Sequence, residues 1–371
     1  MRANNVLGLI FSDTYDSALP EMTSIRSMGS IPFCGRYRLI DFALSNFVNC
    51  GISKVGVITG SNYQSLMNHL GTGKAWDLSR KNEGMYILPP FCRTGSSFCC
   101  HRIEALSGIR NFIRHSKEEY VILCDCNVIC NLNIKAMLNF HTESNADITV
   151  AYTYGNLPNL PDLLSFEPDS DGRIVYSPAS HGKDGKTNYS LNIFVLRKAL
   201  LETLINESLD IRSMSFERDI IRRNLGRLRI MGYNVSSFNR TVDSLRSYYS
   251  ISMELLNPEN TKTLFNPNRP VLTKVRDDFP AVYGLGSSVK NSLVANGCVI
   301  DGEVENCIIF RGVRISKGAR VRNSIIMQNG FIGESSQVCC SVTDKNCSIT
   351  SNKNIIGDIR FPIYIGKGLV I

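Results

Sequence analysis

The chain repeats one six-residue pattern three times, as Val289-Lys-Asn-Ser-Leu-Val294, Val304-Glu-Asn-Cys-Ile-Ile309 and Val321-Arg-Asn-Ser-Ile-Ile326. The copies start 15 and 17 residues apart. Glycines follow at Gly297, Gly302, Gly312, Gly318 and Gly333. Short apolar strands at this spacing, with small residues at the corners, are typical of a left-handed parallel β-helix with about 18 residues per coil.

In such a β-helix the inward valine and isoleucine side chains fill the tube, and glycine or asparagine takes the corner positions with positive φ. The alternative is a β-sandwich built from equally short strands. Three matches to one pattern favour the β-helix, which we predict over residues 283–371.

The first two-thirds of the chain alternates apolar runs with helical patterns. The predicted strands include Val6–Phe11, Val55–Thr59, Tyr120–Cys124 and Asp147–Thr153. The predicted helices include the face from Leu39 to Val48, which Gly51 ends, and the segments Glu104–His115, Asn133–His141 and Val242–Leu255. Nearly continuous apolar strands that alternate with helices favour a doubly wound, mostly parallel sheet covered on both faces. We therefore predict an α/β domain over residues 1–256.

The segment between these two regions has a different composition. Asn257–Pro280 holds four prolines and four asparagines and shows little periodicity. Proline and asparagine favour turns and extended backbone. We predict an extended linker over residues 257–282.

The composition argues against a membrane-spanning protein and against a nucleic-acid-binding protein. The 371 residues are 43% hydrophobic and carry a formal net charge of +8, with the basic residues scattered along the chain. No apolar run is long enough for a transmembrane helix, and no basic stripe with interleaved aromatics predicts nucleic-acid binding. The 13 cysteines form no CxxC pair, so we expect reduced, mostly buried thiols in a cytoplasmic protein.

Four motifs resemble the bacterial ADP-glucose pyrophosphorylase (glucose-1-phosphate adenylyltransferase) family. They are Pro32-Phe-Cys-Gly-Arg-Tyr-Arg-Leu-Ile-Asp-Phe-Ala-Leu-Ser-Asn46, Gly71-x-Gly-x-Ala-Trp-Asp-Leu-x-Arg80, Leu264-Phe-Asn-Pro-x-x-Pro-Val-Leu-Thr273 and Gly297-Cys-x-Ile-x-Gly302. The resemblance covers nearly the whole chain. It implies an enzyme that makes ADP-glucose and pyrophosphate from ATP and glucose 1-phosphate, for glycogen or starch synthesis.

The phosphate-binding loop departs from that family. The family has a glycine-rich loop ending in Arg-Leu after its first strand, and backbone N–H groups of such loops cradle phosphates. Here the run is Phe11-Ser-Asp-Thr-Tyr-Asp-Ser-Ala-Leu19, which has no glycine or arginine and places Asp13 and Asp16 where phosphate would sit. Like charges about 4 Å apart repel by roughly 4 kcal/mol at an effective dielectric constant near 20. Met28 also stands where the family has a phosphate-binding lysine.

The resemblance implies further losses at the metal, nucleotide and sugar contacts. Asp125 keeps one metal-binding aspartate of the family, but Thr241 replaces the second, so Mg²⁺ is expected only if activity is retained. The family's nucleotide loop is replaced by His101-Arg-Ile-Glu104. Its sugar-phosphate motif is replaced by Tyr176-Ser-Pro178, which has no lysine.

These departures resemble the non-catalytic partner subunit of the family. We therefore expect a regulatory, largely inactive subunit that pairs with a catalytic subunit. The resemblance implies a homo- or hetero-oligomer, with a tetramer as the expected form. One alternative is a competent sugar-1-phosphate nucleotidyltransferase that uses Asp125 with Arg26 or Arg102. Another is a non-catalytic sugar-phosphate sensor. A β-helix acyltransferase is disfavoured because no histidine follows His181 to act as a general base.

We assign no catalytic residue and regard Asp125 as a vestige of the family's metal site. Two groups of candidate binding residues remain. Arg26, Arg36 and Arg38 could bind an anionic sugar-phosphate effector, because the resemblance places this segment near the contact between the two domains. Their alternative role is ion pairing with carboxylates such as Asp41. A vestigial sugar or nucleotide pocket is predicted at Trp76, Asp77, Glu104 and Ser190, with simple packing as the alternative for the tryptophan.

Overall fold

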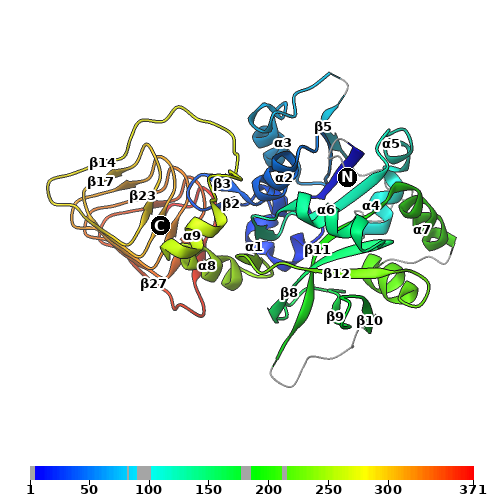
Figure 1. Ribbon diagram of the computed structural model, residues 1–371. Helices are drawn as coiled ribbons and strands as arrows, with labels where there is room; N and C mark the ends of the chain where they lie inside the picture. Colours follow the sequence, from blue (N-terminus) through cyan, green and yellow to red (C-terminus); the bar gives the residue numbers. More distant parts are fainter. Residues whose placement is uncertain (1–4, 82, 90–101, 177–184, 211–214) are drawn as a thin grey trace.

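The computed structural model describes residues 5–81, 83–89, 102–176, 185–210 and 215–371. An α/β part and a β-helix lie side by side, with helices α8 (Leu245–Glu254) and α9 (Pro258–Leu264) between them (Figure 1). Among the described residues, no helix is both long and apolar enough to cross a membrane.

Four parallel strands form the centre of the α/β part. They run in the order β6 (Tyr120–Asp125), β1 (Val6–Phe11), β4 (Lys54–Ile58) and β5 (Gly84–Leu88). All six residues of β1 are buried, as expected for a strand covered by helices on both faces. The carboxyl ends of these strands therefore share one edge, where sites in such folds are built.

The sheet is more mixed than the sequence predicts. Strand β11 (Lys186–Arg197) runs antiparallel to β6 and joins the centre to four more strands. These are β8 (Ile148–Asn156), β9 (Ser165–Pro168), β10 (Ile174–Tyr176) and β12 (Ile230–Asn234). Only β12 pairs in parallel among these additions, with β8. Buried runs of apolar residues predict strands, but they do not reveal strand direction.

The helices and short pairings complete this part of the chain. The remaining helices are α1 (Pro20–Thr23), α2 (Leu39–Cys50), α3 (Gln64–Leu70), α4 (Arg102–Gly108), α5 (Arg110–Arg114), α6 (Ile134–Glu143) and α7 (Lys198–Asp210), with a π-helical turn η5 (Phe216–Ile221). Short 3-10 turns are η2 (Asp16–Ala18), η3 (Met28–Ser30), η4 (Lys74–Trp76) and η6 (Arg222–Asn224). Small antiparallel pairs join β2 (Pro32–Phe33) to β3 (Tyr37–Arg38) and β7 (Val128–Cys130) to β13 (Asn239–Thr241).

Two helix predictions illustrate what glycine does. Gly51 follows α2 with φ of 90°, a left-handed conformation that glycine adopts without strain, so the predicted end of this helix is confirmed. The single helix predicted over Glu104–His115 is wrong, because α4 ends at Gly108 and α5 begins at Arg110. Glycine costs about 1 kcal/mol in a helix interior, and the break falls there.

The prediction of an extended linker is also wrong in its first part. Residues Pro258–Leu264 form α9, which Asn257 caps by accepting a hydrogen bond from the backbone N–H of Glu259 at 3.0 Å. Asparagine at the cap followed by proline at the first position is a recognised helix start. The following residues pack along the α/β part, where the Asn131 side chain donates to the carbonyls of Leu264 and Arg269, both at 2.8 Å.

The repeats fold as predicted into a left-handed β-helix of three five-stranded parallel sheets. Val289 pairs with Val304 and Val304 with Val321, so the repeated valines stack along the tube. The corner residues Asn291 and Asn306 have φ of 43° and 52°, and the first donates a side-chain hydrogen bond to the second at 2.7 Å. The strands are β14 (Val282–Tyr283), β15 (Ser288–Lys290), β16 (Leu293–Val294), β17 (Val299–Ile300), β18 (Glu303–Glu305), β19 (Ile308–Ile309), β20 (Arg314–Ile315), β21 (Arg320–Arg322), β22 (Ile325–Ile326), β23 (Phe331–Ile332), β24 (Gln337–Cys339), β25 (Ser341–Thr343), β26 (Ser348–Ile349), β27 (Asn354–Ile356) and β28 (Ile363–Ile365).

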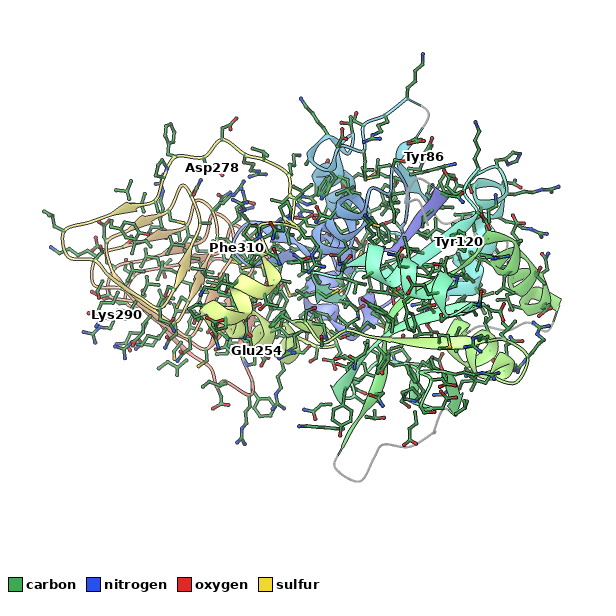
Figure 2. All side chains as sticks on the ribbon, viewed as in Figure 1. Tyr86, Tyr120, Glu254, Asp278, Lys290 and Phe310 are labelled. Carbon is green, nitrogen blue, oxygen red and sulfur yellow. The ribbon has the colours of Figure 1, made fainter. Side chains whose placement is uncertain are left out.

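One apolar core runs through both parts. Phe310 and Met327 of the β-helix belong to the same buried cluster as the apolar residues of α2, and Figure 2 labels Phe310 at this junction. Tyr248 and Tyr249 of α8 donate hydroxyl hydrogen bonds to the carbonyls of Pro32 and Asn323, each at 2.6 Å. The two parts therefore form a continuous packed interface.

A buried ion pair crosses the same interface. The Arg26 guanidinium lies 2.6 Å from the Asp344 carboxylate, and the two side chains are 3% and 0% exposed. Tyr364 donates its hydroxyl to Asp344 at 2.7 Å, and the backbone N–H of Lys345 donates to the other carboxylate oxygen at 2.7 Å. Both oxygens of this buried carboxylate are thus hydrogen-bonded, one of them to a group from each part.

The ten cysteines in the described residues are all free thiols, and most are buried. Cys92, Cys99 and Cys100 lie outside the described residues.

We predict that Arg26→Ala lowers the free energy of unfolding by about 3–5 kcal/mol, because it leaves the Asp344 carboxylate buried without its charged partner. Urea denaturation followed by circular dichroism measures this loss. The exposed Arg314→Ala is the matched control and should change stability by less than about 0.5 kcal/mol. Equal stability of the two variants would show that the buried pair does not hold the interface.

Candidate functional site

The loop after β1 is closed by its own side chains. The Ser12 hydroxyl donates to the carbonyl of Ile58 at 2.8 Å, and the Asp16 carboxylate accepts the backbone N–H of Met28 at 2.7 Å. The Met28 side chain, at the position of the family's lysine, is 2% exposed and packs in the core. The Asp16 carboxyl group therefore already accepts the backbone N–H of Met28, which is then not free for a phosphate. The thioether of Met28 stands where the family has the ammonium group of a lysine.

Two acidic groups with raised pKa values lie in the same loop. Burial raises the pKa of Asp13 to about 6. Burial also raises the pKa of Asp16 to about 8, and the nearby Asp13 contributes to the rise. A group whose negative charge is already disfavoured marks a place where a further anion such as triphosphate is disfavoured too.

Asp125 ends β6 at the carboxyl edge of the sheet, and a buried arginine neutralises it. Arg102, the first residue of α4, lies 2.5 Å from the Asp125 carboxylate and also pairs with Glu217 of η5. The arginine is 4% exposed. Its guanidinium carbon lies over the rings of Phe11, Phe194 and Phe216 at 5.2, 5.5 and 5.6 Å.

One guanidinium faces two carboxyl groups in this cluster, so its positive charge can balance only one of them. Burial disfavours the charged arginine, but Asp125 and Glu217 outweigh that cost and raise the pKa of Arg102. Burial raises the pKa of Asp125 to about 7, against the opposing attraction of Arg102. Beside the cluster, Asn192 donates its side-chain amide to the Tyr15 hydroxyl at 2.8 Å.

These residues do not fit Mg²⁺. Oxygen ligands around Mg²⁺ must be arranged octahedrally and are mostly carboxylates, water and phosphate. Here the guanidinium of Arg102 stands where a cation would meet Asp125, and Thr241 offers a hydroxyl in place of a second carboxylate. In the part of the chain that the structure describes, no three His, Cys, Asp or Glu side chains are grouped to hold a metal.

Sequence reasoning named Asp125 and Arg102 but missed Glu217. Nothing in the run Phe216-Glu-Arg-Asp219 shows that its first turn reaches the carboxyl edge of the sheet.

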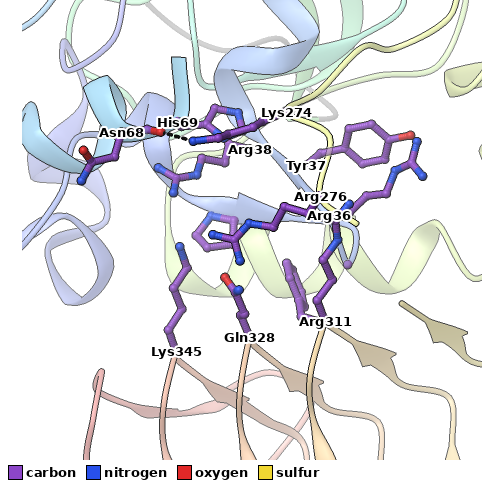
Figure 3. A pocket seen from close by; sticks show the side chains of 13 residues that line it. Arg36, Tyr37, Arg38, Asn68, His69, Lys274, Arg276, Arg311, Gln328 and Lys345 are labelled. Atoms are coloured by element: carbon purple, nitrogen blue, oxygen red, sulfur yellow. Dashed lines mark hydrogen bonds between the residues drawn. The ribbon is translucent and has the colours of Figure 1, made fainter. Parts of the chain in front are cut away.

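A strongly basic cavity of about 170 Å³ lies between the α/β part and the β-helix (Figure 3). One wall comes from the β2–β3 hairpin and the end of α3, a second from the linker after α9, and a third from the β-helix corners. In Figure 3, Lys345, Gln328 and Arg311 rise from the β-helix toward the side chains of the other walls. Its basic lining residues are Arg36, Arg38, Lys274, Arg276, Arg311 and Lys345.

Few of these charges are compensated. No carboxylate is among the described residues that line the cavity. Arg311 lies 3.4 Å from Asp278, while Arg38 donates to the Ser65 carbonyl at 2.6 Å and Lys274 to the Asn68 carbonyl at 2.6 Å. Carbonyl partners orient the cations without cancelling their charge, so the cavity keeps a positive potential.

The pKa values record this excess of charge. Burial, together with the nearby charges of Arg38 and Arg26, lowers the pKa of Lys345 to about 7. Burial lowers the pKa of Arg38 to about 10, with Arg26 and Arg276 adding to the effect. An anion in the cavity would relieve both desolvation and repulsion.

The structure separates the three predicted arginines. Arg36 and Arg38 line the cavity, whereas Arg26 does not, because its guanidinium is held in the buried pair with Asp344. The cations that sequence reasoning missed come from the linker and the β-helix. They lie more than two hundred residues away in the chain, and only the docking of the two parts brings them to the hairpin.

The four residues of the predicted vestigial pocket lie in separate environments. Trp76 is 1% exposed and packs edge-on to His69, with ring centroids 5.7 Å apart. Asp77 is exposed and pairs with Arg80 at 2.5 Å. Glu104 is exposed on α4, and the buried Ser190 hydroxyl accepts the backbone N–H of Asn192 at 2.9 Å. The structure does not assemble them into one pocket.

Parts of two predicted motifs cannot be placed. His101 of the altered nucleotide loop, and Ser177 and Pro178 of the altered sugar-phosphate motif, lie outside the described residues.

The loop after β1 generates a test of its altered electrostatics. The pKa of Asp16 is about 8 in the folded protein, far above the usual value for an aspartate. Between about pH 4 and pH 8 the unfolded chain has released this proton while the folded chain still holds it, so the free energy of unfolding falls as pH rises through this range. We predict that Asp16→Asn, which keeps the acceptor for Met28, raises the free energy of unfolding at pH 8 by more than about 1 kcal/mol and has little effect near pH 4.

Urea denaturation across this pH range measures the difference. The exposed Asp171→Asn is the matched removal of one carboxylate. If both variants gave the same pH profile, the loop would not hold a buried carboxyl group with a raised pKa.

Comparisons with known proteins agree with this arrangement. The family described as "Nucleotidyl transferase" matches residues 17–159, and that described as "GlmU-like, C-terminal hexapeptide" matches residues 282–360. The chain is 35% identical to the glycogen biosynthesis protein GlgD of Bacillus subtilis, over 99% of this chain and 97% of that protein. It is 36% identical to GlgD of Geobacillus stearothermophilus, over 86% and 83% of the two chains.

An enzyme is similar over almost the same length. The glucose-1-phosphate adenylyltransferase of Thermotoga maritima is 33% identical, over 86% of this chain and 76% of the enzyme. Identity of this extent across both the α/β part and the β-helix establishes common descent. The chain belongs to the glucose-1-phosphate adenylyltransferase (ADP-glucose pyrophosphorylase) family.

Proposed function

We propose that this chain is a regulatory, largely inactive subunit of glucose-1-phosphate adenylyltransferase. In this proposal it acts in the cytoplasm, pairs with a catalytic subunit in a hetero-oligomer of tetrameric form, and supports ADP-glucose synthesis for glycogen. Residues 1–256 would form the degenerate catalytic domain, 257–282 the linker and 283–371 the β-helix domain. Two of the relatives carry the name of a glycogen biosynthesis protein and a third that of the adenylyltransferase itself.

The observation that carries the proposal is the buried Arg102–Asp125–Glu217 cluster. Nucleotidyl transfer needs a cation that bridges protein carboxylates and the phosphates of the nucleotide. In this chain a guanidinium fixed to the protein pairs with those carboxylates, and it cannot leave with a substrate or exchange with solvent. The centre is thus converted from a place that binds a metal into one that stabilises the fold.

The loop after β1 supports the same conclusion independently. A triphosphate needs free backbone N–H groups and nearby cations. The loop instead offers Asp13 and Asp16, with the second already bound to the N–H of Met28. Two separate requirements of the reaction, metal and phosphate binding, are therefore missing at two separate places.

We further propose that the basic cavity binds an anionic sugar phosphate that regulates the assembly. Six basic side chains without a lining carboxylate, among the described residues, provide more than enough positive charge to attract one or two phosphate groups. Because the hairpin, the linker and the β-helix each supply cations, a bound anion would favour the docked arrangement over any other. A ligand shifts a conformational equilibrium only through such a difference in affinity.

The competent-enzyme alternative requires Arg102 to leave its buried position. Its departure would leave two buried carboxylates uncompensated unless a metal replaced it at once. No observation favours that exchange over the internal pairing.

The catalytic prediction is tested by ADP-glucose formation from ATP, glucose 1-phosphate and Mg²⁺. We expect no product from the purified chain alone, and a raised rate or altered effector response when it is mixed with the catalytic subunit of the same organism. Asp125→Asn in this chain should leave the response of the mixture unchanged, because the carboxylate takes no part in catalysis. Turnover by the chain alone that disappears in the Asp125→Asn variant would refute the proposal.

The effector prediction is tested with sulfate, which keeps its double negative charge between pH 6 and 8. Lys345 loses its proton around pH 7 in the free protein, so sulfate affinity should fall as pH rises through this range. The fall is expected to reach about tenfold for each unit by which bound sulfate raises the pKa of Lys345. Isothermal titration calorimetry at several pH values measures it.

Two variants identify the groups responsible. Lys345→Arg keeps the charge at every pH and should flatten the profile, which also separates Lys345 from His69, whose pKa is lowered by burial. Arg276→Ala should weaken sulfate binding at all pH values. An unchanged slope in Lys345→Arg would assign the pH dependence to another group.

A further inference from the structure

A second cavity, of about 520 Å³, opens on the α/β part at the strand ends. It is lined by the second halves of β8 and β12, the loop after β12 and one face of α9. It shares no lining residue with the basic cavity. Its volume lies within the range of ordinary small-ligand sites.

Unused polar side chains line this cavity. Asn234, Ser236 and Ser237 are among its lining residues. Within the described part of the chain, their side-chain atoms make no hydrogen bond. An amide and two hydroxyls can each donate and accept, which is also what the hydroxyl groups of a sugar require of a partner.

A buried asparagine fixes the loop that carries these groups. Asn239 is 6% exposed and donates its side-chain amide to the carbonyls of Val235 and Ser237, at 2.8 and 2.7 Å. The backbone N–H of Val235 donates to the carbonyl of Tyr152 in β8 at 2.8 Å, which ties the loop to the sheet. The hydroxyls are therefore presented by a rigid loop, and a ligand need not pay for ordering it.

The cavity also offers aromatic surface and almost no net charge. Tyr154 of β8 is 62% exposed and lines the cavity, so its ring is accessible to a ligand there. Arg240 lies over the Phe238 ring at 5.0 Å, and its charge is compensated by Glu254 at 2.8 Å. The contrast with the basic cavity is plain, since nothing here selects an anion.

We infer that this cavity binds a neutral oligosaccharide. The apolar C–H face of a sugar ring would stack on Tyr154, and the hydroxyls of the same and the next ring would exchange hydrogen bonds with Asn234 and the two serines. The open form of the cavity suits a chain that continues into solvent. This inference goes beyond the regulatory role, which requires only phosphorylated ligands and a protein partner.

Titration calorimetry of the full chain with maltohexaose and with cellohexaose tests the inference. We expect saturable binding of at least one of these neutral sugars, unaffected by added salt because no ion pair takes part. Tyr154→Ala should raise the Kd about threefold to tenfold, as loss of one ring contact predicts. Tyr154→Phe should bind like the unmodified chain, because it keeps the ring.

Matched variants complete the design. The joint change Ser236→Ala and Ser237→Ala should weaken binding, whereas Tyr63→Ala removes a similarly exposed tyrosine outside the cavity and should have no effect. A preference for maltohexaose would assign the site to α-linked glucans, and equal affinities would assign it to neutral sugar chains in general. No binding of either sugar, or the same Kd for Tyr154→Ala as for the unmodified chain, would overturn the inference.

Discussion

A guanidinium from the α/β part and a carboxylate from the β-helix meet where water does not reach, and the architecture rests on that contact. Arg26 and Asp344 are separated by most of the chain, so their pairing fixes which coil of the β-helix faces the α/β part. The neighbouring residue Lys345 is thereby placed in the basic cavity. A misdocked β-helix would leave both charges buried and unpaired, a cost that ordinary apolar contact could not offset.

The positive charges of the Arg102 cluster and of the basic cavity have opposite surroundings. At the carboxyl edge of the sheet, Arg102 meets Asp125 and Glu217, and the charge of the guanidinium is cancelled within the protein. At the domain junction, Arg36, Arg276 and Lys345 face one another without a lining carboxylate among the described residues. Cancelled charge contributes to a rigid core, whereas uncancelled charge remains available to a ligand. The proposed regulatory role is consistent with this distribution.

The sequence predicts the fold well and the sites unevenly, for physical reasons. The valine repeat fixes the β-helix because every coil obeys the same local rule, and Gly51 ends α2 for a reason confined to one residue. Loss of the glycine-rich loop is visible in the same way, since it is a change in consecutive residues. Helix α9 was missed because four prolines outweighed the capping signal of Asn257.

Contacts between residues that lie far apart in the chain have no comparable signal in the sequence. Glu217 reaches Arg102, and Arg311 reaches the hairpin, only after sheets and coils have packed. Arg26 and Arg36 look alike in the sequence, yet the first is buried in an ion pair and the second lines a cavity. Charge type is local information, but the identity of the neighbour is set by packing.

The uncompensated charge of the basic cavity has a consequence for the lifetime of the protein. Mutual repulsion among its cations opposes the docked state, so the empty cavity is a weak point of the interface. Any anion that binds only the docked form stabilises it in proportion to the logarithm of its concentration relative to its Kd. Proteases act on opened chains, so abundance of the protein would follow the supply of that anion. The cations that bind the regulatory anion would thus also determine the lifetime of the protein in the cell.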